Sequence, residues 1–472
     1  SRARCRARAP PVRAAARPPP RSTRLPRLGL LDQQRVHLAA VRAQHLEAEP
    51  VDHDRLAALG QPPETPHHSW GVARCASSLC HGAVQTWKQS SVLQNEYVTW
   101  SRMDKHARAY TVLLNERSQE IARRLALPEP AHRSAVCLDC HAHNVPEPRR
   151  GERFTLADGV GCEACHGPAG RYIVSHVQQG STRKDNLARG MYPTADHVAR
   201  AQLCLSCHFG NAQKFVTHKM MAAGHPRMSF ELDTFTQIQP PHYRFDSGEV
   251  WDGVRIWAIG QAYGAHELLD ILNDPKRGRD GLFPELVLFD CHACHHPMTD
   301  RRNAGARLGV GPGVMRLYDS NLLMLRQIAR LVDADGSARF EAQVRRVHQS
   351  VASGNDALAQ ARALQQQISK LVPHIGRYRF AGGDLQAILL GLIDDGLDGQ
   401  YTDYQGAEQA VMALQSVADF MQKRGLIKTA LIAQPMKNLM SAVAFDEKYR
   451  PATFQAALRD LKSSLGPATQ MP

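Results

Sequence analysis

The chain has 472 residues, which is too long for one small core and predicts two or more domains. Its formal charge is +13, but residues 1–31 hold nine Arg and no Asp or Glu, so the remainder carries only 13 − 9 = +4. A nucleic-acid-binding protein spreads its excess charge over folded elements, so this class is not favoured. No apolar run reaches about 18 residues, and no membrane-spanning helix is predicted.

The first 65 residues differ in composition from the rest of the chain. Arg and Pro dominate the start of this segment, which has too few apolar residues to build a core. We expect residues 1–65 to be disordered or of doubtful origin. The segment contains no apolar stretch of the kind that marks a secretory signal.

Residues 66–300 concentrate the cysteines and histidines. Ten of the eleven Cys lie between Cys75 and Cys294, and eighteen of the 23 His lie between His67 and His296. The segment is rich in Gly and Pro turns, so little regular secondary structure is expected. Hydrophobic periodicity predicts helices at roughly 103–126 and 254–272. We interpret residues 66–300 as one domain built around a shared chemistry.

Residues 301–472 contain no cysteine and have helical periodicity. Apolar side chains recur at helical spacing in two stripes, which are Leu322, Leu325, Ile328 and Leu331, and then Val411, Leu414, Val417 and Met421. Breaks are predicted at Gly382-Gly383 and at Asp394-Asp395-Gly396, with Gly399 just after the second. The pattern predicts a mainly α protein that ends in an all-helical C-terminal domain with its own core.

Five cysteine pairs carry the chemistry, and each pair is followed at once by a histidine. Four have the form C-x-x-C-H: CLDCH (Cys137, Cys140, His141), CEACH (Cys162, Cys165, His166), CLSCH (Cys204, Cys207, His208) and CHACH (Cys291, Cys294, His295). The other, CASSLCH, has four residues between Cys75 and Cys80 and then His81. We refer to the motifs as 1 to 5 in chain order, beginning with CASSLCH.

C-x-x-C-H is the attachment sequence of haem c. Two thiols add to the vinyl groups of one porphyrin, and the following imidazole lies where it can ligate the iron. Cysteine pairs could also bind Zn²⁺, act as redox dithiols or form disulfides, but none of these requires the histidine. The repeated pattern therefore predicts five covalent haems c, with the five motif histidines as iron ligands.

A second histidine is available for every iron. Subtracting the five motif histidines leaves 18 − 5 = 13 between His67 and His296. Two histidine ligands leave no open coordination position on the iron, which suits electron transfer. One open position would instead let a small nitrogen or sulfur compound bind. Both interpretations stay open at this stage.

Three further stretches resemble bacterial multihaem cytochromes c of the cytochrome c-554 and hydroxylamine oxidoreductase type. They are RMDKHARAY (102–110), DGVGCEACHGPAG (158–170) and THKMMAAGHPRMSFE (217–231). The resemblance covers about 70–300 and implies that His106 and His225 are distal ligands, with His176 and His218 as weaker assignments. Nitrite-reducing relatives carry a CxxCK motif, which this chain lacks, and hydroxylamine-oxidising relatives carry more haems.

The stretch FDCHACHHPM, residues 289–298, contains two more histidines. On a helical turn His296 points about 100° away from His295, so it could ligate only a neighbouring iron. CxxCHHP also looks like a motif of small tetrahaem cytochromes in which the second His does this. We therefore predict His296 as a distal ligand and His292 as a spacer residue.

These observations predict a multihaem cytochrome c domain at residues 66–300, followed by a helical domain at 301–472. The predicted function is electron transfer in a bacterial respiratory or redox chain, through mostly bis-histidine haems. The alternative is an oxidoreductase that acts on a small nitrogen or sulfur compound. Redox proteins are the expected partners, a homo-oligomer could form through the helical domain, and haem c attachment implies a periplasmic or extracellular location.

Overall fold

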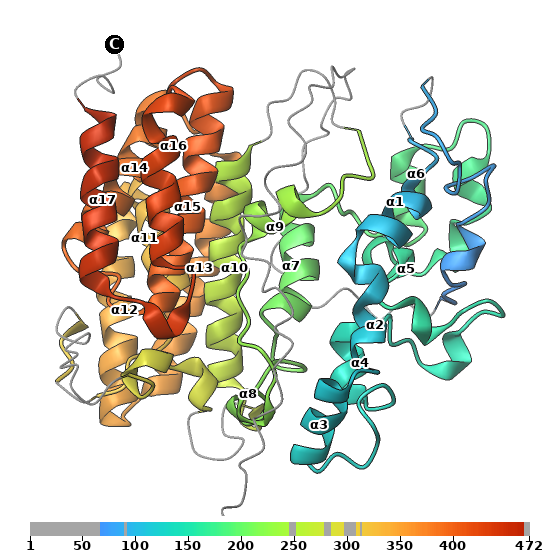
Figure 1. Cartoon of the computed structure of the whole chain (residues 1–472), viewed down its shortest axis with the longest axis horizontal. Helices are drawn as coiled ribbons and strands as arrows, with labels where there is room; N and C mark the ends of the chain where they lie inside the picture. The colour runs from blue at the N-terminus through green and yellow to red at the C-terminus, as the bar shows by residue number, and fades with distance from the viewer. Residues whose placement is uncertain are drawn as a thin grey trace, which may run out of the picture. The chain divides into compact units, whose positions relative to one another are not determined.

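A computed structural model describes residues 67–88, 92–244, 252–277, 285–296, 308–311 and 314–466 (Figure 1). Within these ranges the chain forms seventeen α-helices and no β-strand, so the predicted mainly α fold is confirmed. All of them belong to one compact unit, Ala39–Pro472. The segment 1–65, which we expect to be disordered, lies outside the described residues.

The part of the chain that carries motifs 1 to 4 consists of short helices joined by turns. These are α1 (Glu96–Met103), α2 (Ala109–Val112), α3 (Glu116–Arg124), α4 (Ala135–His141), α5 (Cys162–His166), α6 (Arg183–Ala188), α7 (His197–His208), α8 (His218–Ala223) and α9 (Leu232–Ile238). Several 3₁₀ turns connect them, which agrees with the expectation of little regular secondary structure in this part of the chain.

The prediction of one continuous helix at roughly 103–126 is wrong. Asp104 has extended backbone angles and its side chain accepts a hydrogen bond from the His106 N–H, which starts a new 3₁₀ turn at Lys105–Arg108. Asn115 likewise caps α3 by accepting from the Ser118 N–H. Short polar side chains that bond to the nearby backbone compete with helix continuation, and periodicity alone does not reveal this.

Longer helices form the second half of the molecule. They are α10 (Gly253–Asn273), α11 (Ser320–Val332), α12 (Ala334–Ser353), α13 (Ala357–Arg377), α14 (Gly382–Leu397), α15 (Tyr404–Lys423), α16 (Thr429–Ala442) and α17 (Pro451–Leu465). Helix α10 confirms the prediction at 254–272, and α14 begins at Gly382 as the first predicted break requires. The second predicted break is close to the observed one: Asp394-Asp395-Gly396 is the last turn of α14, which ends at Leu397, and Gly399 follows before α15 begins at Tyr404.

Helix α10 is the centre of this bundle. It packs against α13 and α11 on one side and against α7 and α9 on the other (Figure 1). Most of its side chains are buried, as expected for a helix that is covered on nearly every face. Gly260 allows the close approach to α9, since a Cβ there would lie 2.6 Å from Leu232 Cβ.

Two apolar cores of very different size support the fold. The larger runs from Ala201 in α7 to Leu465 in α17 and includes both predicted stripes, with Leu331 at its edge. The smaller contains only five buried residues, Leu113, Ala122, Ala131, Leu138 and Ala142. The large core therefore continues across residue 300, where the composition predicts a domain boundary, and residues before α7 have little apolar core of their own.

Candidate functional site

The five Cys-Cys-His motifs occupy short turns or helix ends. Motifs 2 and 3 lie on α4 and α5, motif 4 ends α7, and motif 5 begins a 3₁₀ turn at Cys291–Ala293. In motif 1 the His81 N–H donates to the Cys75 carbonyl (3.2 Å), much as the His295 N–H donates to the Cys291 carbonyl in motif 5 (2.8 Å). The longer spacer of motif 1 therefore closes into a turn of the same kind. None of the ten motif cysteines forms a disulfide.

Each motif histidine faces a second histidine from another part of the chain. The ring centres of the five pairs are 5.9–6.4 Å apart: His81 with His176 (6.3 Å), His141 with His225 (6.4 Å), His166 with His242 (6.3 Å), His208 with His106 (5.9 Å) and His295 with His218 (6.2 Å). These five pairs form the candidate site.

This separation fits one metal ion between two imidazoles. A metal–imidazole bond is about 2.0 Å and the ligating nitrogen lies about 1.1 Å from the ring centre, so opposed rings have centres about 6.2 Å apart. Rings in direct contact also have centres about 4.5–7 Å apart, so the distance by itself does not identify a metal site. What favours one is that all five motif histidines have a second histidine at this distance.

Two of the paired histidines donate from Nδ1 to a carboxylate. His81 contacts Glu96 (3.0 Å), and His106 contacts Asp104 (2.9 Å). Burial alone would raise the pKa of Asp104, but its hydrogen bonds and charge contact with His106 outweigh burial and lower the pKa to about 2. Such partners fix the ring orientation, leave Nε2 for a metal and increase the basicity of the ligand.

Four other paired histidines have their Nδ1 atoms beside backbone carbonyl oxygens. The acceptors are Ala109 for His141 (3.1 Å), Tyr172 for His176 (3.0 Å), Pro226 for His225 (2.8 Å) and Pro240 for His242 (3.4 Å). Burial lowers the pKa of both His166 and His208 to about 4. Neutral rings with an available Nε2 are the form in which histidine ligates metals.

The ring planes divide the pairs into two groups. His81 and His176 are almost parallel (7°), and His295 and His218 are inclined by 35°. The remaining three pairs are close to perpendicular, at 81–87°. If each pair held an iron, the two groups of ring planes would split its d orbitals differently.

The partner of His166 is a residue that the sequence did not single out. His242 lies after α9 in the turn QPPHY, whose Pro residues indicate only a turn. His106, His176, His218 and His225 each lie opposite a motif histidine, and their assignment as distal ligands stays a prediction. All five motif histidines are therefore matched without His296, whose assignment as a ligand stays a prediction.

The sites of different motifs are neighbours in a definite order. The Cys75 and Cys162 thiols interact and shift each other's pKa, which brings motifs 1 and 3 together, and Cys140 and Cys207 do the same for motifs 2 and 4. Burial and the nearby Cys204 raise the pKa of Cys165 to about 12, which links motifs 3 and 4.

Two short segments reinforce this order. The buried Glu163 of motif 3 accepts hydrogen bonds from the Trp70 and Gly71 N–H groups just before motif 1 (3.0 and 2.7 Å). Helix α8 begins with His218, the partner of motif 5, and is followed by His225, the partner of motif 2. Motifs 1 and 3, 3 and 4, and 4 and 2 are thus neighbours, and α8 connects the partner histidines of motifs 2 and 5.

The fifth site is completed by the C-terminal bundle. His292 is buried, its Nδ1 accepts from the Tyr404 N–H (3.3 Å), and its ring stacks near Tyr449. The Gln405 amide contacts the Cys291 sulfur (3.5 Å). The spacer residue His292 thus anchors the motif to the start of α15, a role that spacing in the sequence could not indicate.

One comparison with known proteins bears on these sites. Residues 74–167, which include motifs 1 to 3, match the model of the family "Cytochrome c554 and c-prime". This match supports a c-type cytochrome family, with covalently bound haem c and haem-based electron transfer in general. The finer resemblance to the hydroxylamine oxidoreductase type stays a prediction.

The other comparisons give no relative. No curated protein matches the chain, and no solved structure matches it. No helix among the described residues is long and apolar enough to cross a membrane. Within the same residues, no group of three or more His, Cys, Asp or Glu side chains is placed to hold a single metal ion.

Proposed function

We propose that this chain is an electron-transfer cytochrome that carries five covalent haems c, each held between two histidines. The observation that carries the proposal is the set of five histidine pairs, whose ring centres are 5.9–6.4 Å apart. Each pair combines one motif histidine with one histidine from a different segment. The proposed distal set is His106, His176, His218, His225 and His242.

The residues of each site have separate tasks in this proposal. The ten motif cysteines form thioether bonds to the porphyrin edge, and the paired Nε2 atoms ligate iron, which supplies one-electron transfer between Fe(III) and Fe(II). Glu96 and Asp104 hold their histidines through Nδ1 and stabilise the oxidised state by increasing ligand basicity. With two histidines at each position, no site offers an open coordination place for a substrate.

The order of the sites supports a conducting row. Thiol contacts and shared segments make neighbours of sites 1 and 3, 3 and 4, 4 and 2, and 2 and 5. Sites 1 and 5 are then the ends of the row. We propose that electrons enter at one end and leave at the other.

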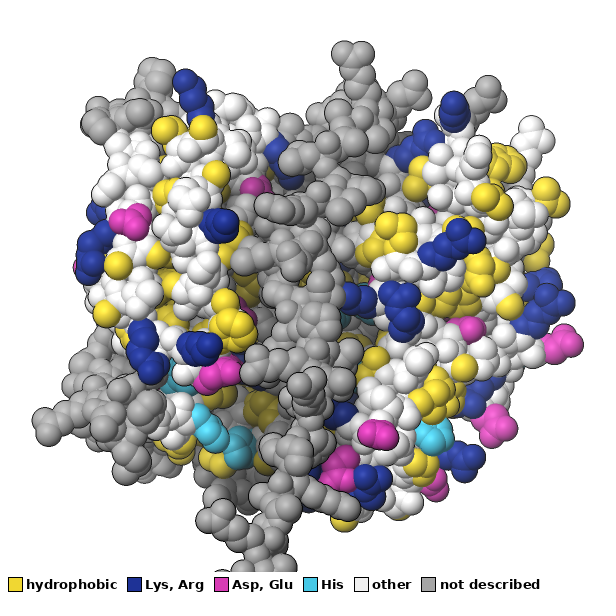
Figure 2. Space-filling model, in the orientation of Figure 1, with side chains coloured by type: hydrophobic (Ala, Val, Ile, Leu, Met, Phe, Trp, Pro, Cys, Tyr) yellow, Lys and Arg dark blue, Asp and Glu magenta, His cyan; other side chains and the backbone are white. Residues whose placement is uncertain are grey.

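Redox proteins are the proposed partners, and an exported location is proposed because haem c attachment occurs outside the cytoplasm. Large apolar side chains near site 1 are exposed, including Leu79, Val84, Trp87, Val174 and Val177. Figure 2 shows apolar and basic side chains together on the visible face of the part that carries α1 to α6. Such mixed surfaces suit transient docking of a protein partner.

Haem counting and electron paramagnetic resonance test the proposal. We expect pyridine haemochrome analysis and intact mass to give five covalent haems per chain. The oxidised protein should contain only low-spin iron, with the parallel and perpendicular ring pairs giving separate signals. A high-spin ferric signal that changes on addition of nitrite or hydroxylamine would instead identify an open site and contradict a pure electron carrier.

A further inference from the structure

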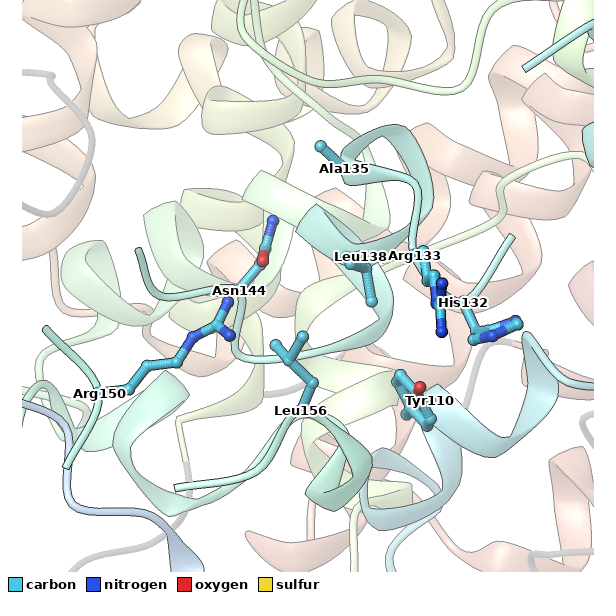
Figure 3. A pocket seen from close by; sticks show the side chains of 8 residues that line it. All are labelled: Tyr110, His132, Arg133, Ala135, Leu138, Asn144, Arg150 and Leu156. Carbon is cyan, nitrogen blue, oxygen red and sulfur yellow. The ribbon is translucent and has the colours of Figure 1, made fainter. Parts of the chain in front are cut away.

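A cavity of about 540 Å³ lies beside motif 2 but outside the histidine pairs. Eight described residues line it: Tyr110, His132, Arg133, Ala135, Leu138, Asn144, Arg150 and Leu156 (Figure 3). Its volume is within the range of small-molecule sites, about 300–1,000 Å³. Leu138 belongs to motif 2, but no motif cysteine and no paired histidine is among the lining residues.

Basic side chains approach the cavity from opposite sides. In Figure 3, Arg150 lies on one side, His132 and Arg133 lie on the other, and Leu138 and Leu156 lie between them. The lining includes no Asp or Glu. An occupant therefore meets positive charge at both ends and an apolar surface in the middle.

The polar groups at the cavity are only partly used by the protein. Arg150 donates from Nε to the Val145 carbonyl (2.7 Å) and packs on the Phe154 ring, and neither contact neutralises its charge. Arg133 has no ion pair among the described residues. Guanidinium groups present several donors in a planar fork that matches a carboxylate.

His132 and Asn144 define the two ends more closely. The Gln119 amide nitrogen lies 3.4 Å from His132 Nδ1, so this amide donates to the ring and a neutral His132 carries its proton on Nε2. Asn144 donates its amide N–H to Asp139 (2.6 Å), which leaves Arg150 as the main donor at its end. The Tyr110 ring meets the His132 ring edge to face, with centres 6.5 Å apart.

From these contacts we propose that the cavity binds a small organic dianion, such as a dicarboxylate with a short apolar spacer. Arg150 binds one carboxylate, Arg133 and His132 bind the other, and Leu138 and Leu156 contact the spacer. The proposal goes beyond electron transfer and does not depend on it. Because α4 carries both Leu138 and the motif 2 residues, the bound dianion lies next to a redox site.

Calorimetric titration of the haem-loaded full chain with glutarate tests this site. We expect saturable binding of one glutarate per chain that weakens as salt increases. Arg133→Gln and Arg150→Gln should each weaken binding tenfold or more, which corresponds to about 1.4 kcal/mol. Arg123→Gln is the matched control, since Arg123 is an exposed arginine that pairs with Glu120 on α3 (2.5 Å). It should bind as the unaltered protein does.

Several results would overturn the proposal. Glutarate could fail to bind, or bind equally well to both cavity variants. Sulfate binding as tightly as glutarate would show a simple anion site to which Leu138 and Leu156 contribute nothing. A change in the haem spectrum of Arg133→Gln or Arg150→Gln without ligand would show that these side chains support a haem instead. Each variant must first retain the haem content of the parent.

Discussion

Single hydrogen bonds decide which nitrogen of each histidine is available. Asp104 illustrates this, because one carboxylate caps a 3₁₀ turn and also accepts from His106 Nδ1. Its second oxygen accepts from the Gln239 amide (3.1 Å), which leads directly to the turn that carries His242. Gly159 lets its own backbone approach His106 closely, since its φ is +68° and a Cβ there would lie 2.7 Å from the His106 carbonyl oxygen.

His242 provides the sharpest test at the residue scale. Replacement by Ala should leave His166 as the only protein ligand of its iron and convert one of the five haems to a high-spin state. Electron paramagnetic resonance and the visible spectrum of the oxidised protein measure this change.

The control for that experiment is His296→Ala. We expect it to leave all five haems low-spin, because each motif histidine already faces another partner. The opposite pattern, with high-spin iron in His296→Ala and none in His242→Ala, would reject the pairing of His166 with His242 and favour the ligand role predicted for His296.

Buried charges connect motif 5 to the helical bundle. Arg316 is 2% exposed and contacts Asp290, which precedes the motif, Asp319 before α11 and Asp403 before α15. Burial and the charge of Asp403 outweigh Arg316 and raise the pKa of Asp290 to about 7. One arginine thus holds three elements around the fifth site.

Arg316→Met should therefore destabilise the protein by about 3–5 kcal/mol, because it leaves buried carboxylates without their cation. The loss should be larger at pH 8 than at pH 5. The folded-state pKa of Asp290 is about 7 with Arg316 present, and removing this cation raises it further. As the pH rises through about 7, ionisation of this carboxyl therefore costs the variant more stability than the unaltered protein. Denaturant unfolding followed by far-UV circular dichroism measures both effects.

The matched control lies on α11, the helix that Asp319 precedes. Arg330 pairs with Glu341 at the surface (2.8 Å, with Arg330 44% exposed), and Arg330→Met should change stability by less than about 1 kcal/mol. Equal effects of the two substitutions, or no pH dependence for Arg316→Met, would show that the buried cluster does not hold the elements together.

The whole molecule combines two kinds of core. The bundle from α10 to α17 buries a continuous set of apolar side chains, whereas residues 67–200 share a cluster of five. Five flat macrocycles would supply the missing apolar contact in the second case. We therefore expect the described part before α7 to depend on haem for its stability and the bundle to be stable without it.

Hydrogen exchange of protein produced without haem attachment tests this dependence. We expect slow exchange in α10, α11, α13 and α15 of the haem-free chain and fast exchange in α1 to α5. The haem-loaded protein should be protected in both parts. Strong protection of α1 to α5 without haem would mean that the short helices form a stable core unaided.

The sequence alone determined the chemistry and the class of fold. Five Cys-Cys-His motifs need only local spacing, and the stripes at 322–331 and 411–421 need only helical periodicity, so both were predictable. The helix ends at Asp104, Asn115 and Asp398 were not predictable in this way, because side-chain capping and packing determine them.

Only the tertiary structure decided which histidines face each other. Thirteen candidates were available for five positions, and contact between segments as distant as His166 and His242 leaves no local pattern in the sequence. The same holds for the link between motif 5 and α15, and for the cavity at Arg133 and Arg150. Motifs are encoded by neighbours along the chain, whereas ligand pairs and cavities arise from the way distant segments pack.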